Sequence, residues 1–161
     1  SPGSILIKGV GESSDAYHVS SPPPEGLGAR QAMQSALQQA RLSAQDIDYI
    51  HLHGTATKNN DAIESIAVSA VFERKPPASS TKGATGHCLG AAGALNVAIG
   101  ALALQQQTAW GSPGTEELDA ALSPIHYLMH NVARPMSHVL SNSFGFGGSS
   151  CSIVLGLKDR V

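Results

Sequence analysis

The sequence lacks an excess of one charge, a cysteine framework and a long apolar run, and each absence excludes a class of protein. Ten Lys and Arg against twelve Asp and Glu give a net charge of −2, which argues against a broad nucleic-acid-binding face or a basic membrane patch. The two cysteines form no CxxC pair, so a reducing compartment is the simpler interpretation. The longest apolar run, Ala91 to Leu104, contains Asn96 and is too short to span a bilayer. We therefore expect a cytoplasmic protein that binds neither nucleic acid nor a membrane.

What is present is the composition of one domain in which strands and helices alternate. Apolar residues make up 42% of the 161 residues, enough for a single core over residues 1–161. The patterns predict strands near 5–10, 47–53 and 76–82, helices over 29–40, 61–71 and 91–105, and closing strands at 137–144 and 149–157. Between them, residues 106–135 show only one short strand near 127–129. This order predicts an α/β layered fold with a mixed, mostly parallel sheet. The helix over 91–105 is apolar on nearly every side, so we expect it to lie buried between sheets.

The first candidate site is the strand exit HLHGTATKNND, residues 51–61. His51 and His53 alternate, so they share one side of the strand if it continues that far, and His-x-His is a common metal-ligand spacing. With His87 as a third ligand, this pattern would support a metal-dependent hydrolase, although no carboxylate or cysteine nearby completes the set. A structural role for a histidine at a strand end is the simpler alternative.

Two acids follow in the same segment. Asp61 and Glu64 fit a capping box, with Asp61 at the N-cap of a helix and Glu64 reaching back to it. Asn60 just before the cap is suited to a left-handed backbone conformation. This interpretation accounts for both acids without a role in chemistry.

Two glycine-rich stretches are the other candidates. STKGATGHCLGAAG, residues 80–93, is not a phosphate loop because the GxxxxGK[ST] order is absent. Its Lys82 and His87 stand at the front edge of an apolar helix, a costly place for a cation unless a carboxylate meets it. NSFGFGGSS, residues 142–150, is either a hairpin turn packed under its own aromatic rings or a gate whose backbone amides bind an oxyanion.

Together and in this order, HGTAT, TKGATGHCLGAAG and NSFGFGG resemble the C-terminal half of the β-ketoacyl-acyl carrier protein synthases, condensing enzymes of the thiolase superfamily. The resemblance runs from about Ile5 to Leu157. It implies a thiolase-like fold, of which this chain is the C-terminal half of the αβαβα layers, without the N-terminal half that bears the nucleophile. The implied reaction is decarboxylative Claisen condensation of an acyl thioester with malonyl-acyl carrier protein, in fatty-acid or polyketide/polyene synthesis.

The resemblance also assigns catalytic roles to matching positions. His53 and His87 correspond to the paired histidines that hydrogen-bond the malonyl thioester carbonyl and stabilise the enolate left when CO₂ departs. Lys82 corresponds to the family's lysine, and Glu64 to the acid that pairs with it. The amide of Phe146 corresponds to half of the oxyanion hole, and its ring to the gate of the acyl pocket.

Substrate-binding positions follow in the same way. Thr55 and Thr57 match the hydroxyls that hydrogen-bond the phosphopantetheine arm. Three further positions of the gate segment are expected to bind substrate: Phe144, Gly145 and Gly147. No cofactor or metal is implied beyond the phosphopantetheine of acyl carrier protein. The implied partners are acyl carrier protein, the N-terminal half of the same synthase, and a second subunit in a homodimer or a ketosynthase/chain-length-factor heterodimer.

Two departures from the family pattern stand out. After HGTAT the family usually has Pro-x-Gly-Asp, whereas residues 58–61 here are KNND. The family's nucleophilic cysteine also has no match here. Cys88 follows His87, where we expect a packing thiol, and alternation with Ile153 predicts that Cys151 is a core residue. The chain alone is therefore expected to be inactive.

A non-catalytic chain-length-factor-like partner subunit is the alternative function. Carbon–carbon cleavage of the thiolase type is disfavoured because Cys151 lies in no Cys-x-Gly motif.

Overall fold

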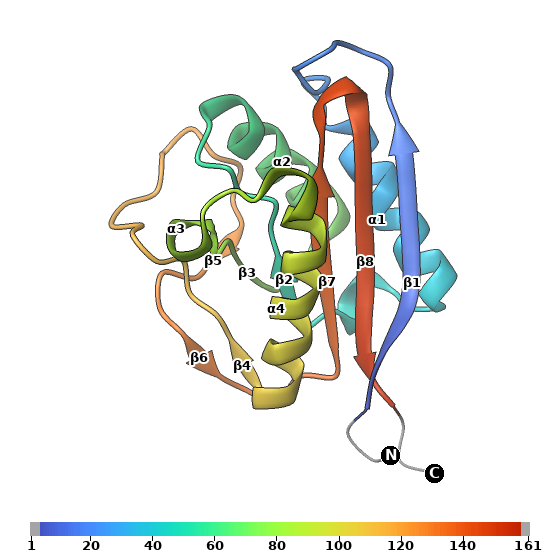
Figure 1. The fold of residues 1–161 in the computed structure, drawn as a ribbon, viewed down its shortest axis with the longest axis vertical. Helices are drawn as coiled ribbons and strands as arrows, with labels where there is room; N and C mark the ends of the chain where they lie inside the picture. Colours follow the sequence, from blue (N-terminus) through green and yellow to red (C-terminus); the bar gives the residue numbers. More distant parts are fainter. Residues whose placement is uncertain (1–3, 159–161) are drawn as a thin grey trace.

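A six-stranded sheet in the order β1-β8-β7-β2-β3-β5 forms the centre of the computed structural model, which describes residues 4–158 (Figure 1). The strands are β1 (Ile5–Ser14), β8 (Ser149–Leu157), β7 (His138–Phe144), β2 (Tyr49–His51), β3 (Pro77–Ser79) and β5 (His126–Tyr127). Pairings among β7, β2, β3 and β5 are parallel, and those of β8 with β1 and β7 are antiparallel. The mixed, mostly parallel sheet is thus confirmed. The three residues at each end of the predicted domain lie outside the described part.

Helices cover both faces of this sheet. α1 (Leu27–Ala40) and α2 (Lys58–Val71) pack on one face, and α4 (Ala92–Gln106) lies on the other, in front of the sheet in Figure 1. Alternation in β7 supplies both cores, since Leu140 belongs to the cluster under α1 and α2, whereas Val139 belongs to the cluster under α4. The helical spacing predicted for α1 is confirmed: its buried residues are Gly28, Ala29, Ala32, Met33, Ala36 and Leu37.

Close approach of α1 to β1 depends on glycine. A Cβ atom added to Gly11 would lie 2.0 Å from the Ala32 carbonyl oxygen, and one added to Gly9 would lie 2.2 Å from that of Ala36. Any side chain at these two positions would therefore push the helix off the edge strand.

Several boundaries differ from the sequence prediction. β2 ends at His51, not His53, and α2 begins at Lys58, three residues before Asp61. Residues 106–135 contain the short strands β4 (Thr108–Ala109), β5 and β6 (Val132–Ala133), with β4 and β6 in a separate two-stranded sheet. Short strands of two residues carry too little periodicity to be seen in a sequence.

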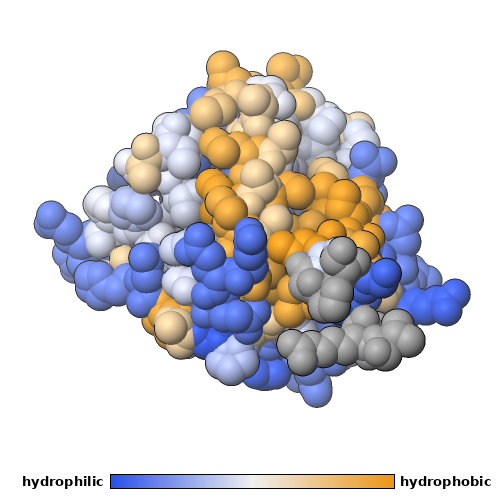
Figure 2. Space-filling model, turned by 60° about the horizontal axis from the view of Figure 1, so that its bottom comes forward, coloured by the Kyte–Doolittle hydropathy of each residue, from blue (hydrophilic) through white to orange (hydrophobic). Residues whose placement is uncertain are grey.

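The apolar helix α4 is covered on only one side, contrary to the expectation that it is buried all round. Asn96, Gly100 and Ala103 are buried, whereas Ala98 and Leu102 on the outer side are exposed. Figure 2 shows a broad apolar band on the side of the molecule that carries α4. The stretch Leu89–Gln106 is also long and apolar enough to cross a membrane, which corrects the prediction that this run is too short, but one such helix is weak evidence for a span.

Candidate active site

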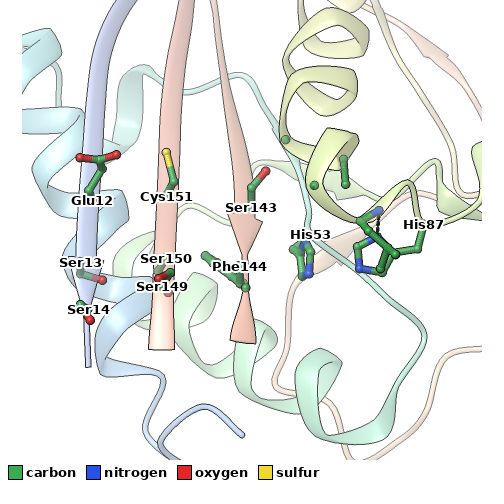
Figure 3. Close-up of a pocket in the computed structure, with 15 residues that line it drawn as sticks. Glu12, Ser13, Ser14, His53, His87, Ser143, Phe144, Ser149, Ser150 and Cys151 are labelled. Atoms are coloured by element: carbon green, nitrogen blue, oxygen red, sulfur yellow. Dashed lines mark hydrogen bonds between the residues drawn. The ribbon is translucent and has the colours of Figure 1, made fainter. Parts of the chain in front are cut away.

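Three loops that are far apart in the sequence meet at one edge of the sheet. They follow the ends of β2, β3 and β7, and they cover residues 52–57, 80–91 and 145–148. Because β2 is parallel to both β3 and β7, these loops leave the sheet at the same edge. The three sequence motifs therefore converge, as Figure 3 shows for His53, His87 and Phe144.

His53 and His87 lie side by side at this edge. Their ring centroids are 5.4 Å apart with an interplanar angle of 83°, and the His53 ring lies 5.6 Å from the ring of Phe144. His53 is 5% exposed, whereas His87 is exposed. The Leu89 amide donates a hydrogen bond of 3.3 Å to His87 Nδ1, drawn as the dashed line in Figure 3. An acceptor at Nδ1 places the single proton of a neutral His87 ring on Nε2.

The surroundings of His53 keep its ring neutral. Burial is the largest cause that lowers the pKa of His53 to about 3, and the neighbouring Lys82 and His87 lower it further. Its Nδ1 is buried and has no hydrogen-bond partner among residues 4–158. A neutral imidazole carries one N–H donor, so His53 presents an uncharged donor at neutral pH.

Glu64 binds the main chain at residues 53–54. The carboxylate oxygens of Glu64 accept hydrogen bonds from the amides of His53 (2.9 Å) and Gly54 (2.8 Å). Asn142 Nδ2 donates a third bond of 3.2 Å to the same carboxylate. Glu64 is 3% exposed, and its burial raises its pKa against the lowering effect of these three donors.

Lys82 binds the other polar group of the His53 main chain. Its ammonium group donates a hydrogen bond to the carbonyl oxygen of His53. Burial lowers the pKa of Lys82, and the negative charge of Glu64 opposes that shift. Within the described residues the two charges form no direct ion pair, so Lys82 and Glu64 are paired through the main chain of His53.

The predicted capping box is wrong. The N-cap of α2 is Thr57, with extended backbone angles φ −96° and ψ 133°, and Asp61 lies one turn inside the helix. Glu64 is turned inward to the exit of β2 and does not reach back to Asp61. The left-handed positions of the turn are Gly54 (φ 44°) and Ala56 (φ 60°), not Asn60. Tertiary bonds to the carboxylate therefore override the local capping pattern.

His51 does not join the pair. It is fully buried, and its Nε2 lies 3.1 Å from Oγ1 of Thr81, which follows β3. Burial and the charge of Lys82 lower the pKa of His51 to about 3. Among the described residues, no three His, Cys, Asp or Glu side chains are placed to hold a metal ion. The His51, His53 and His87 ligand set considered from the sequence is therefore not assembled.

A cavity of about 640 Å³ runs alongside the histidine pair. Thr55 and Thr57 line it, with their hydroxyl oxygens 2.9 Å apart. Phe146 lines the same cavity and is 83% exposed, so this part of the hairpin is not packed under its own aromatic ring. In the turn at residues 145–148, Gly147 adopts φ 79° and its amide donates to the carbonyl of Val19. The Phe146 amide has no hydrogen-bond partner within the part of the chain that the structure describes.

A second, more open cavity of about 620 Å³ is also lined by His53 and His87, and Figure 3 shows its lining. Cys151 lines it beside Glu12, its partner across β1 and β8, and is partly exposed. The expectation that Cys151 is a core residue is therefore wrong, because α4 does not extend over this end of β8. Burial still raises the pKa of the Cys151 thiol. Cys88 is exposed and is not a packing thiol within this chain.

Sequence reasoning missed the walls that the N-terminal segment supplies. The end of β1 lines the more open cavity, and the loop at residues 20–23 lines the other. These positions are Ser, Glu and Pro residues at a strand end and in a loop, and only their loop character was visible in the sequence. No motif signalled a contribution to a site.

Known proteins resemble this chain in sequence. The profile of the family described as "Beta-ketoacyl synthase, C-terminal domain" matches residues 5–115. The 3-oxoacyl-[acyl-carrier-protein] synthase 2 of Coxiella burnetii is 41% identical over 154 residues, which cover 92% of this chain and 37% of the relative. The protein of that name from Rhizobium meliloti is 43% identical over 155 residues, with 92% and 36% covered. The chain thus spans little more than a third of the length of these relatives.

Solved structures resemble it as well. A chain in the complex of a ketosynthase with its chain length factor, from Xenorhabdus doucetiae, superposes with a TM-score of 0.91 at 44% identity, covering 96% of this chain and 39% of that one. A β-ketoacyl synthase from Burkholderia phymatum gives a TM-score of 0.90 at 34% identity, with 95% and 37% covered.

Proposed function

Because the chain belongs to the β-ketoacyl synthase family, we propose that it supplies part of an active site for decarboxylative condensation. The substrates are an acyl thioester and malonyl-acyl carrier protein, in fatty-acid, polyketide or polyene synthesis. The observation that carries this proposal is the placement of His53 and His87, with ring centroids 5.4 Å apart at a cavity. Two N–H donors side by side suit a single oxygen on which negative charge develops.

Decarboxylation of a malonyl thioester requires hydrogen-bond donors that remain uncharged. Breaking the bond to the carboxylate of a malonyl thioester releases CO₂ and leaves its electron pair as an enolate. Donors on the thioester oxygen stabilise that charge, and losing one such donor typically costs ~3–4 kcal/mol of transition-state stabilisation. A proton on His53 as a full imidazolium could instead be transferred to the reacting carbon. The low pKa of His53, about 3, removes that side reaction at neutral pH.

The remaining groups take supporting roles. The hydroxyls of Thr55 and Thr57 bind the phosphopantetheine arm in the cavity of about 640 Å³. The Phe146 amide gives half of an oxyanion hole for the acyl thioester, and the exposed Phe146 ring acts as the gate. Phe144, Gly145 and Gly147 shape the same entrance. Glu64 and Lys82 hold the main chain of His53 by its amide and its carbonyl group, respectively.

The site needs groups from elsewhere. We propose that a nucleophilic cysteine comes from an N-terminal half, which also covers the exposed side of α4, so the chain alone is inactive. Acyl carrier protein delivers both substrates, and no cofactor or metal takes part. The working assembly is a cytoplasmic homodimer or a heterodimer with a chain length factor. Support for the kind of partner comes from the similar solved structure of a ketosynthase in complex with its chain length factor.

The test is malonyl-acyl carrier protein decarboxylation by the complete synthase that contains this chain. His87→Ala should lower the rate about a hundred- to a thousandfold, while His126→Ala, which removes an exposed histidine of β5, should leave it unchanged. Equal rates for all three proteins would instead support the alternative, a non-catalytic partner subunit of the chain-length-factor kind.

A further inference from the structure

One buried side chain joins the elements around the active site without lining either cavity. Asn142, in β7, has 0% exposure. Its main-chain oxygen accepts a bond of 3.1 Å from Asn96 Nδ2 of α4, and its side-chain Nδ2 donates to Glu64 of α2 at 3.2 Å. Nδ2 also lies 3.5 Å from Met33 Sδ of α1. The Oδ1 atom accepts a bond of 2.7 Å from the Ser152 hydroxyl of β8. The residue thus contacts both helical layers and the neighbouring strand.

The orientation of the Asn142 side-chain amide follows from the chemistry of Glu64. An ionised carboxylate can only accept hydrogen bonds, so the amide of Asn142 must present Nδ2 to it. That orientation leaves Oδ1 buried, and a buried carbonyl without a donor is costly. Ser152 supplies the donor. Without the Ser152 hydroxyl, rotation of the Asn142 amide would become more favourable, and the bond from Nδ2 to Glu64 would weaken.

The position of the Glu64 carboxylate affects the His53 ring through two backbone amides. Glu64 accepts from the amides of both His53 and Gly54, and Gly54 adopts the left-handed φ of 44° that starts the turn. The position of the Glu64 carboxylate therefore sets where the main chain of His53 lies, and with it the ring. A shift of this carboxylate by a fraction of an ångström moves the donor that faces the substrate.

We propose that Asn142 and Ser152 are positioning residues, which hold the Glu64 carboxylate on the amides of the 53–54 turn. Neither residue touches substrate. Their contribution rests on the proposed function of His53, since a correctly placed ring matters only if the ring takes part in the reaction.

Ser141 provides a matched control. It is the neighbour of Asn142 in β7, it is 2% exposed, and its hydroxyl oxygen has no hydrogen-bond partner among the described residues. Ser141→Ala and Ser152→Ala therefore remove the same atom from equally buried positions on adjacent strands. Only the second change breaks a bond in the network.

The experiment compares Ser152→Ala, Ser152→Thr and Ser141→Ala in the complete synthase. Condensation kinetics give kcat and KM, and hydrogen exchange read by mass spectrometry gives the protection of the His53 and Gly54 amides. In Ser152→Ala we expect kcat to fall about tenfold or more with little change in KM, and faster exchange at residues 53–54. Ser152→Thr keeps the hydroxyl and should restore both readouts. Ser141→Ala should match the parent protein.

Unchanged exchange at residues 53–54 in Ser152→Ala would overturn the proposal, whatever happens to kcat. A uniform rise in exchange along the whole chain would overturn it too, because that result marks general destabilisation. The exchange readout does not depend on turnover. A parent synthase without condensing activity would therefore contradict the proposed function, while the effect of Ser152 on the turn would still be measured.

Discussion

At the scale of single residues, the environment of one histidine explains most of the proposed chemistry. His53 is buried and lies near two other groups that carry or can carry positive charge, Lys82 and His87. Both influences act in the same direction and keep the ring uncharged. Lys82 therefore has two roles, as a donor to the His53 carbonyl and as a fixed positive charge near its ring.

Removing the charge of Lys82 should raise the pKa of His53 toward its ordinary value. Lys82→Met keeps an unbranched side chain, one heavy atom shorter than lysine, and deletes the charge. NMR titration of the His53 ring should show a higher pKa in this variant than in the parent, with no change in Lys75→Met, which alters an exposed lysine. An unchanged or lower His53 pKa in Lys82→Met would contradict this electrostatic account.

His51 should make folding stability depend on pH. Its pKa is about 3 in the folded chain and about 6.5 in an unfolded one. Between these values the unfolded state binds more protons, so the free energy of unfolding should fall as pH falls from about 6.5 toward 3. For one group the slope approaches 1.4 kcal/mol per pH unit, in rough terms. His51→Gln should make the slope shallower in denaturant unfolding at pH 7, 6 and 5. Equal slopes would show that His51 is not the source.

The family resemblance assigned four residues to one site, and the structure places them around one turn without a direct contact between Glu64 and Lys82. Motif order singled out His53, His87, Lys82 and Glu64, and all four lie around the same turn. The sequence could not show that Glu64 and Lys82 both bind the main chain of His53 and do not contact each other directly. Spacing along the chain does not tell which backbone groups a carboxylate reaches. Asn142 was seen only as part of a motif, since three of its four partners lie 46 to 109 residues away and the fourth, Ser152, lies on the neighbouring strand.

At the scale of elements, helices and strands were predictable where their periods were long. The apolar spacing of α1 and the alternation in β7 and β8 gave correct positions, whereas β2, β3 and β5 are three residues or fewer. Local capping patterns misplaced the start of α2, because Glu64 has stronger tertiary partners. The walls formed by β1 and the loop at 20–23 came from packing alone.

Packing of α1 on β1 gives a stability prediction. Gly11→Ala would place a Cβ atom 2.0 Å from the Ala32 carbonyl oxygen, so the helix must move. We expect a loss of about 1–3 kcal/mol or more in the free energy of unfolding, measured with denaturant. Gly90→Ala is the matched change, because a Cβ atom at Gly90 would meet nothing within 4 Å. Equal stability of the two variants would contradict the close approach.

At the scale of the whole molecule, the main feature is that no other part of the described chain covers the outer, apolar side of α4. Leu102 is 45% exposed on a helix with few polar residues, and an apolar band of this kind marks a surface that binds another protein or a membrane. The sequence predicted burial of this helix on all sides, because composition records that a face is apolar and not which polypeptide covers it.

If an N-terminal half covers this side, a charge on it should prevent assembly and spare the fold of the chain. Leu102→Glu should abolish co-purification of the two halves when they are expressed as separate polypeptides, with an unchanged circular dichroism spectrum of this chain. Leu118→Glu, at an exposed apolar residue outside α4, should leave assembly intact. Normal assembly with Leu102→Glu would rule out α4 as the contact.

The proposed chemistry depends on His53 and His87 donating to one oxygen of the substrate. The most direct measurement is a crystal structure of the complete synthase with a non-decarboxylating malonyl thioester analogue on the pantetheine arm. We expect the thioester oxygen at hydrogen-bond distance, about 2.7–3.1 Å, from an N–H of each ring. An analogue bound with that oxygen turned away from both rings, in a synthase that is active in solution, would contradict it.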